Sequence, residues 1–432
     1  MPLKHTVKEI ILKNGAKGIL IDVPDSTVIA YQFNFRAGGD YTDIEKEQTA
    51  HIMEHLAFGA NKKFKTLEEF SHEYTKNGAR RNATTSDVNM RYTFESALME
   101  WDRILDLANL AITQPEFDNE KLNMEKSTVR EELIGYANNY GRIMWQKVWR
   151  SMGAEFLLDP ECLETIDNIE LSDITSYFIK THTLNNMRFS LAGDLTKHND
   201  QITKMLNEWD LPSGKLLPIK KTKYKYSDVV LVKKKDIVNV NFGIMIVLNR
   251  HLSKNEILAM GALNHILTGT FHSRIFGKVR NDGICYHISS GSSTDRNDMS
   301  RWTFSGQVSF DNVEKLFILI RDQLEKVINE GITESELEMA KQFGLGSHQM
   351  AAQTVAGLSR WYSDDYFDYE EIDEMDKFPD RISDTQLEDI IKIAKEFINS
   401  GIWTLGLAGN ITDKQARQYQ DIFKPLLGGP KK

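Results

Sequence analysis

The chain has little cysteine. Only two of its 432 residues are cysteines, Cys162 and Cys285. Their separation matches neither a metal-ligand nor a redox spacing, so the cysteines do not indicate a metal or redox site. We therefore expect two buried thiols in a reducing compartment.

Long apolar segments are also missing. Residues Met1–Ile11 contain no apolar core of signal-peptide length, and no run approaches the length of a membrane span. Nothing in the sequence exports the protein, so we expect it in the cytoplasm and not in a membrane.

An excess of positive charge is absent as well. The net charge is -9 at pH 7, and the lysine-rich pieces, such as Lys220–Lys225, are short. Nucleic-acid-binding proteins usually carry a basic footprint, so this class is disfavoured. The remaining composition, 41% hydrophobic and 27% charged, is ordinary for a soluble globular protein of two or three domains.

The segment HIMEH places three reactive side chains within one helical turn. Residues four apart share a helical face, so His51 and His55 can aim their imidazoles at one point, a common start for a zinc site. Glu54 projects to nearly the same side, where it could take a proton from a water activated by the metal. The pattern H-x-x-E-H inverts the zinc-protease motif H-E-x-x-H. A hydrogen-bonded histidine pair without metal would show the same spacing.

The surrounding sequence favours the metal site. Residues Thr49–Phe58 otherwise read as a buried helix, in which two histidines and a glutamate are costly without a metal or partner. A catalytic zinc site needs a third protein ligand, and the helical stretch Asn119–Ile134 offers three glutamates. Glu125 and Glu132 lie on one face of that helix, whereas Glu131 points elsewhere.

These motifs resemble the pitrilysin (M16) metallopeptidase family, in particular its short, two-domain, processing-peptidase-like members. In that family a glutamate on a downstream helix completes the inverted motif, and Glu125–Leu133 (EKSTVREEL) matches its pattern. The resemblance implies one zinc ion per chain, bound by His51, His55 and Glu132. It also implies that Glu125 is the supporting carboxylate.

Further stretches extend the resemblance, and Gln48 is among the residues that depart from it. One stretch resembles the edge strand that binds substrate in the family, and it consists of Asn82, Ala83, Thr84 and Thr85. Asn186–Asp194 (NMRFSLAGD) resembles the closing strand of the domain. Gln48 stands where a glycine is usual before the first histidine.

The second half resembles a family segment that handles substrate. Residues Phe276–Ser289 (FGKVRNDGICYHIS) correspond to a segment whose Arg and Tyr reach the bound peptide, here Arg280 and Tyr286. An Arg can hold a carbonyl or carboxylate, and a Tyr hydroxyl can donate to an oxyanion. Their spacing is one residue shorter than usual. The alternative is a strand-flanking Arg with a core Tyr.

The chain is two copies of one domain. Three pairs of segments recur in the same order at a nearly constant offset of half the chain: Leu191–Thr196 with Leu407–Thr412, Arg91–Phe94 with Arg301–Phe304, and Leu122–Lys126 with Leu337–Lys341. A polar, proline-bearing stretch lies where a linker should be. We expect an N-terminal domain over 1–208, a linker over 209–227 and a C-terminal domain over 228–432.

Only the first copy keeps the metal-binding residues. At the repeat offset, Gly261, Asn264 and His265 stand in place of His51, Glu54 and His55, and Ser347 stands in place of Glu132. His265 is therefore expected to be a structural remnant.

The order of elements in each half predicts an α+β domain. Each half opens with apolar, β-branched strands, Val28–Phe35 and Ile237–Val247, then passes through a helix, further strands and a helical stretch to the repeated LAG strand. In an α+β domain, hairpins join the strands of a sheet, and the helices pack on one face of that sheet. The family resemblance implies two LuxS/MPP-like metallohydrolase domains, each a sheet with helices on one face, which face each other across a cleft.

These features predict a zinc-dependent endopeptidase acting on peptides or unfolded segments, with Glu54 as the general base. A non-catalytic or partner-dependent subunit remains an alternative, as does a zinc hydrolase acting on a non-peptide bond. We expect a homodimer, with a hetero-partner of the same family as the alternative. Neither nucleic acid nor membrane is an expected partner.

Overall fold

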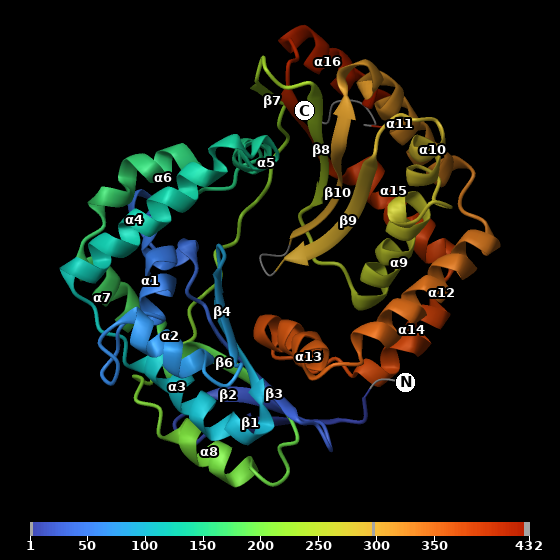
Figure 1. Cartoon of the computed structure of the whole chain (residues 1–432). Helices are drawn as coiled ribbons and strands as arrows, with labels where there is room; N and C mark the ends of the chain where they lie inside the picture. The colour runs from blue at the N-terminus through green and yellow to red at the C-terminus, as the bar shows by residue number, and fades with distance from the viewer. Residues whose placement is uncertain (1–2, 296–298, 427–432) are drawn as a thin grey trace. The chain divides into compact units, whose positions relative to one another are not determined.

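The computed structural model describes residues 3–295 and 299–426, which form two compact units, each built around a β-sheet (Figure 1). The first unit extends to Gly135 and adds residues 159–220 and 348–376. The second contains residues 136–158 and 221–347 and continues from Lys377. This confirms the α+β class and the two domains. The expected boundaries, 1–208 and 228–432, do not coincide with the units, because each half of the chain contributes a segment to the other unit.

The first sheet has the strand order β1-β2-β6-β3-β5-β4. Its strands are β1 (Thr6–Ile11), β2 (Lys17–Asp22), β3 (Val28–Phe35), β4 (Arg80–Thr85), β5 (Met90–Ala97) and β6 (Met187–Gly193). β2 and β6 are parallel, and the other pairs are antiparallel. Within the described residues β4 is an edge strand, paired only with β5.

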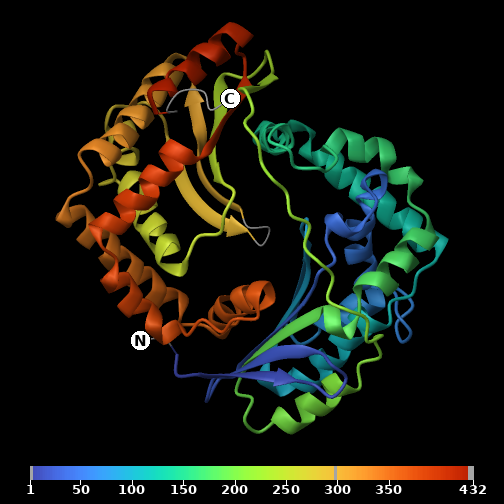
Figure 2. The same ribbon diagram turned by 180° about the vertical axis from the view of Figure 1, so that it is seen from behind.

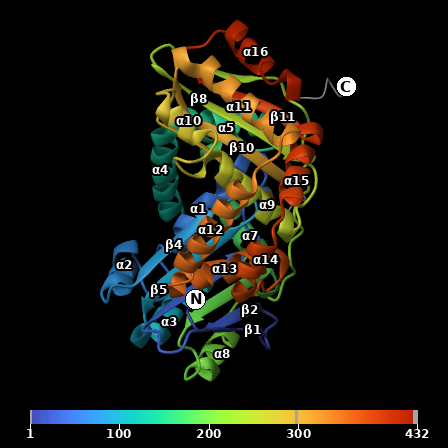
Figure 3. The same ribbon diagram turned by 90° about the vertical axis from the view of Figure 1, so that its right-hand side faces the viewer.

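Helices cover one face of this sheet. They are α1 (Thr49–Ala57), α2 (Leu67–Thr75), α3 (Trp101–Thr113), α4 (Asn119–Gly135), α6 (Asp159–Thr165), α7 (Leu171–Thr181) and α8 (Asn199–Asn207). The odd-numbered residues of β3 face them: the Tyr31 hydroxyl donates to the carbonyl of Trp101, and Phe35 stacks on His182. α1 packs between α4 and α7 (Figure 3).

The second sheet repeats this topology. It consists of β7 (Val230–Lys233), β8 (Asn239–Leu248), β9 (His287–Asp295), β10 (Met299–Ser309) and β11 (Ile402–Gly409), in the order β7-β11-β8-β10-β9. This order matches β2-β6-β3-β5-β4 strand for strand, and β7 and β11 are again parallel. The repeated segments Arg91–Phe94 and Arg301–Phe304 lie in β5 and β10, which correspond.

The main core of the second unit lies between this sheet and its helices. The helices of the C-terminal half are α9 (Lys254–Asn264), α10 (Phe276–Asn281), α11 (Val313–Asn329), α12 (Glu334–Ala351), α13 (Val355–Tyr369), α14 (Phe378–Asp384), α15 (Leu387–Ser400) and α16 (Asp413–Asp421). The even-numbered apolar residues of β8 pack against this side, because side chains alternate along a strand.

The other face of each sheet is covered by a helix from the opposite half of the chain. α13 packs on β2, β3 and β6, where Gln32 donates a hydrogen bond of 2.9 Å to the Ser359 hydroxyl. In return, α5 (Tyr140–Ser151) packs on β8 and β11. Glycines make room for it: a Cβ at Gly243 would lie 2.4 Å from Trp145, and one at Gly406 would lie 2.6 Å from Val148. The sequence pattern did not predict this exchange.

The expected linker is irregular. Residues 209–227 form neither helix nor strand (Figure 2). In the part of the chain that the structure describes, no helix has the length and apolar character needed to cross a membrane.

Candidate metal centre

Helix α1 presents its reactive side chains on one side. The helix begins after Gln48, whose carbonyl accepts the first helical hydrogen bond from the Ile52 amide. Its apolar residues are buried, whereas His51, Glu54 and His55 are only half-buried. Burial of the apolar positions therefore fixes the rotation of α1, and this rotation leaves the three polar side chains facing one region.

The structure brings the three predicted ligands together. The Nε2 atom of His51 lies 3.4 Å from a carboxylate oxygen of Glu132, and the rings of His51 and His55 are 4.8 Å apart. One ligand atom from each of the three residues lies within 4.8 Å of the others. Among residues 3–295 and 299–426 this is the one group of three or more His, Cys, Asp or Glu side chains with such spacing.

Helix α4 supplies the carboxylates. It packs directly on α1 (Figure 3). Glu125 and Glu132, seven residues apart on this helix, are half-buried, whereas Glu131 is exposed. Glu125 accepts a hydrogen bond of 3.0 Å from His55 Nδ1. This bond is the largest cause that raises the pKa of His55 above its usual value.

Both histidines have a hydrogen-bond acceptor at Nδ1. Glu125 fills this role for His55, and the side-chain oxygen of Gln48 lies 3.1 Å from His51 Nδ1. A ring that donates from Nδ1 leaves a lone pair on Nε2, and such support is usual for metal-binding histidines.

This set of donors fits zinc. Two imidazole nitrogens and one carboxylate oxygen with an open fourth position are a common catalytic zinc environment. Tetrahedral bonds of about 2.0–2.2 Å place ligand atoms roughly 3.3–3.6 Å apart. The 3.4 Å separation between His51 and Glu132 agrees with that geometry.

Glu54 lies beside these residues and is held by the edge strand. The Thr85 hydroxyl donates a hydrogen bond of 2.5 Å to its carboxylate. Burial raises the pKa of Glu54 above the usual carboxyl value, and the bond from Thr85 acts in the opposite direction. Glu54 is therefore a partly desolvated carboxylate in a fixed orientation, as a general base requires.

The predicted substrate residues lie on β4. Asn82 and Thr84 are exposed, Ala83 is buried, and Thr85 ends the strand at Glu54. Sequence reasoning missed the residue before them: the Arg81 guanidinium lies over the rings of Phe58, Phe70 and Tyr74. These contacts tie β4 to α1 and α2. The sequence did contain a signal for this contact: Phe70 and Tyr74 are four residues apart in the helix Leu67–Thr75, so their rings share one face.

In the second unit, Arg280 and Tyr286 are adjacent to each other. Arg280 lies 4.5 Å from the centre of the Tyr286 ring and donates a hydrogen bond to the Tyr286 carbonyl. The Tyr286 side chain is 82% exposed, so it is not a core residue. This exposure argues against the core-Tyr alternative.

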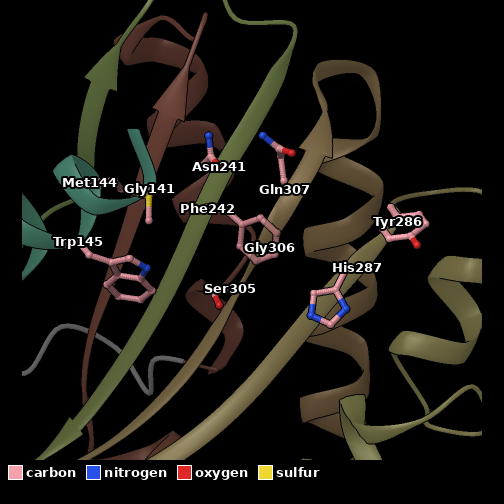
Figure 4. A pocket seen from close by; sticks show the side chains of 10 residues that line it. All are labelled: Gly141, Met144, Trp145, Asn241, Phe242, Tyr286, His287, Ser305, Gly306 and Gln307. Atoms are coloured by element: carbon pink, nitrogen blue, oxygen red, sulfur yellow. The ribbon is translucent and has the colours of Figure 1, made fainter. Parts of the chain in front are cut away.

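Tyr286 also lines a pocket of about 350 Å³ on the sheet face beside α5. Figure 4 shows Trp145 at one end of the pocket and Tyr286 at the other, with Ser305 and His287 between them. All the lining residues belong to the second unit.

At the position equivalent to the metal site, the side chains make packing contacts. His265 follows α9 in a π-helical turn and stacks on Phe343 at 4.2 Å, with its Nδ1 buried and without a hydrogen-bond partner. Asn264, in place of Glu54, accepts a hydrogen bond from the Trp302 indole. That His265 is a remnant of a metal site stays a prediction.

Comparison with known protein families agrees with this division. Residues 26–154, which include the whole metal centre, match the family described as "Insulinase (Peptidase family M16)". Residues 168–343 match "Peptidase M16 inactive domain". The chain belongs to peptidase family M16. It is of the short, two-domain type.

Similar M16 sequences come from several bacteria. A protein of Rickettsia felis named "Uncharacterized zinc protease" is 22% identical over 90% of this chain and 94% of its own length. A Bacillus subtilis protein, "Uncharacterized zinc protease YmxG", is 22% identical over 81% and 85%. A Helicobacter pylori protein, "Non-peptidase homolog YmxG", is 25% identical over 74% and 75%. M16 relatives at this level of sequence identity thus include proteins named as proteases and one named as a non-peptidase.

Solved structures share the M16 fold. A protease from Helicobacter pylori has a TM-score of 0.82 at 19% identity and covers 94% of this chain and 100% of its own. A Pseudomonas fluorescens structure described as a peptidase M16 inactive domain has a TM-score of 0.83 at 16% identity, with 94% and 98% covered.

Proposed function

We propose that this M16 protein is a zinc-dependent endopeptidase that cleaves peptides or unfolded segments bound in extended form along β4. The observation that carries the proposal is the convergence of His51, His55 and Glu132, with Glu54 held next to them by the edge strand. A remnant kept only for packing has no need of three ligand atoms within 4.8 Å of one another.

His51, His55 and Glu132 would hold the zinc ion. When bound, zinc supplies Lewis acidity, which lowers the pKa of a water molecule towards neutrality and polarises a peptide carbonyl. Glu125 keeps His55 oriented through the bond to Nδ1.

Glu54 moves the proton. Its carboxylate accepts a proton as the water attacks the carbonyl carbon, and then delivers this proton to the leaving amine. The Thr85 hydroxyl holds one carboxylate oxygen, which leaves the other oxygen to take the proton.

The edge strand positions the substrate. A peptide can add to β4 as a further strand, and main-chain pairing of this kind reads an extended backbone more than a particular sequence. The second unit would contribute Arg280 and Tyr286 to substrate handling.

A second candidate is a non-catalytic or partner-dependent subunit. The name of the Helicobacter pylori relative, a "Non-peptidase homolog", is the observation in its favour. The complete set of His51, Glu54, His55 and Glu132 speaks against it for this chain.

One experiment separates these candidates. Zinc content is measured on the purified protein, and cleavage of an unstructured peptide is followed with and without a chelator. We expect one zinc per chain, cleavage that the chelator stops, and cleavage that returns with added zinc. Glu54→Gln should keep the zinc and lose activity by about 10²–10⁴-fold, the usual contribution of a general base. Stoichiometric zinc without cleavage of any peptide by the protein alone would favour the partner-dependent subunit.

We also propose a homodimer, because this chain carries both the metal centre and the Arg280–Tyr286 pair and so lacks no recognisable part. Light scattering tests this directly: a fully active monomer contradicts the dimer, and a monomer that is inactive alone indicates a missing hetero-partner.

A further inference from the structure

We propose that Gln48 is a positioning residue that holds His51 in the form that binds metal, with its proton on Nδ1 and its lone pair on Nε2. The inference rests on the proposed zinc site. The family resemblance assigns Gln48 no role, because a glycine is usual at its place and glycine has no side chain to reach the ring.

The start of helix α1 places Gln48 next to the ring. Gln48 occupies the N-cap position, and His51 is the third residue of the first turn. The backbone carbonyl of Gln48 accepts from the Ile52 amide, but its side chain makes no capping bond. The side chain is therefore free to turn towards His51, where its oxygen lies 3.1 Å from Nδ1.

A second contact holds the other end of the amide. The Nε2 group of Gln48 donates a hydrogen bond of 3.3 Å to the sulfur of Cys162, a buried residue of α6. The carbonyl oxygen faces the ring, where it can only accept. It therefore stabilises the ring form that carries its proton on Nδ1, in which Nε2 keeps a lone pair for the metal.

The proton on Nδ1 also determines the state of Nε2, the ring nitrogen that would bind the metal. On the other side of the ring, His51 Nε2 points to Glu132 at 3.4 Å. If the amide were reversed, its NH₂ group would favour a lone pair on Nδ1 and a proton on Nε2, the atom that must bind the metal. The orientation in which the Gln48 oxygen faces Nδ1 therefore favours the binding-competent form.

The two histidine ligands differ in the charge of their supports. His55 has the carboxylate of Glu125, whereas His51 has a neutral amide. Both supports accept from Nδ1, so their shared effect is on the tautomer and orientation of the ring. Loss of such a support commonly weakens metal binding by about 10–100-fold.

The test uses two changes at one position. Gln48→Met keeps the length of the side chain and removes the acceptor, and Gln48→Glu keeps an acceptor. Gln323→Met on α11 of the second unit is the matched control, because it makes the same substitution at a partly buried position away from the site. The zinc Kd is measured by competition with a chromophoric chelator, and NMR of the zinc-bound protein follows the exchange with water of the His51 Nδ1–H, which reports its hydrogen bond.

We expect Gln48→Met to raise the zinc Kd about 10–100-fold and to speed the exchange of the His51 Nδ1–H with water. Gln48→Glu should keep this hydrogen bond and bind zinc as tightly as the parent protein or more tightly. Gln323→Met should match the parent in both measurements.

Two results would overturn the proposal. One is a parent-like Kd and Nδ1–H exchange in Gln48→Met. The other is an equal loss in Gln48→Met and Gln48→Glu, which would mean that position 48 acts through packing. Failure of the proposed function looks different: the parent protein would then bind zinc without cleaving peptide, and the zinc Kd values would still decide the role of Gln48. A parent protein that binds no zinc would contradict both proposals.

Discussion

The Thr85 hydroxyl donates a hydrogen bond of 2.5 Å to the carboxylate of Glu54, which joins the edge strand β4 to the helix α1. The proposed general base and the proposed substrate strand are thus held to each other directly. A peptide that pairs with β4 would lie at a position set by the same residue that orients the base.

Replacing Thr85 tests this connection. Thr85→Val should lower kcat for peptide cleavage by about 10–100-fold, since a hydrogen bond to a charged group contributes about 1.5–3 kcal/mol. Zinc content should not change, and Thr85→Ser, which keeps the hydroxyl, should retain most activity. A change in KM alone would show that Thr85 serves only substrate binding.

The same variant should shift the pH profile. Burial raises the pKa of Glu54 and the bond from Thr85 lowers it, so loss of the bond moves this pKa upwards. The base must be deprotonated to act, and activity should therefore be lost at a higher pH during acidification than in the parent protein. The pH dependence of kcat/KM for the two proteins gives the comparison.

The choice of the third ligand is tested by two neighbouring glutamates. Glu132→Gln should lose stoichiometric zinc and activity, because its carboxylate lies 3.4 Å from His51 Nε2. Glu131→Gln, at an exposed position one residue earlier, should keep both. Metal analysis after dialysis gives the answer, and the reverse pattern would place the ligand at Glu131.

The second unit should affect turnover and not metal binding. Arg280→Ala removes the group that stacks on Tyr286, and Tyr286→Phe removes only the hydroxyl. Both variants should retain zinc and cleave peptide more slowly. Parent-like kinetics in both would remove substrate handling from this pair and leave the Arg–Tyr stack as a local surface contact.

The exchange of helices predicts a difference between two glycines of one sheet. A Cβ at Gly243 would lie 2.4 Å from Trp145 of α5, whereas one at Gly291 would meet no atom within 4 Å. Gly243→Ala should therefore destabilise the protein by about 1–3 kcal/mol through overpacking, and Gly291→Ala should be neutral. Denaturant midpoints measure both, and equal midpoints would mean that α5 does not pack tightly on β8.

Much of the candidate site could be predicted from local spacing. Glu125 and Glu132 share a face of α4 because a helix repeats every 3.6 residues, and the same rule places His51 and His55 together on α1. The equivalence of the two sheets follows from the internal repeat, since similar segments such as Arg91–Phe94 and Arg301–Phe304 occupy equivalent strands.

Contacts between elements distant in sequence could not be predicted in this way. Gln48 was recognised only as a departure from a family pattern, and its bond to Cys162 depends on how α6 packs near the start of α1. The expected domain boundaries also missed the exchange of α5 and α13, because each helix is amphipathic and such a face does not specify which sheet it covers.

The sequence by itself determined the family, the α+β class, the duplication and the set of side chains at the candidate metal centre. Each of these depends on periodicity and spacing along short segments, which the order of residues encodes directly. Only the tertiary structure decided that Thr85 holds Glu54, that Gln48 faces His51, and that each sheet is covered by a helix from the other half. These relationships join residues 31 or more positions apart, or depend on the orientation of one side chain, and the packing of complementary surfaces determines them.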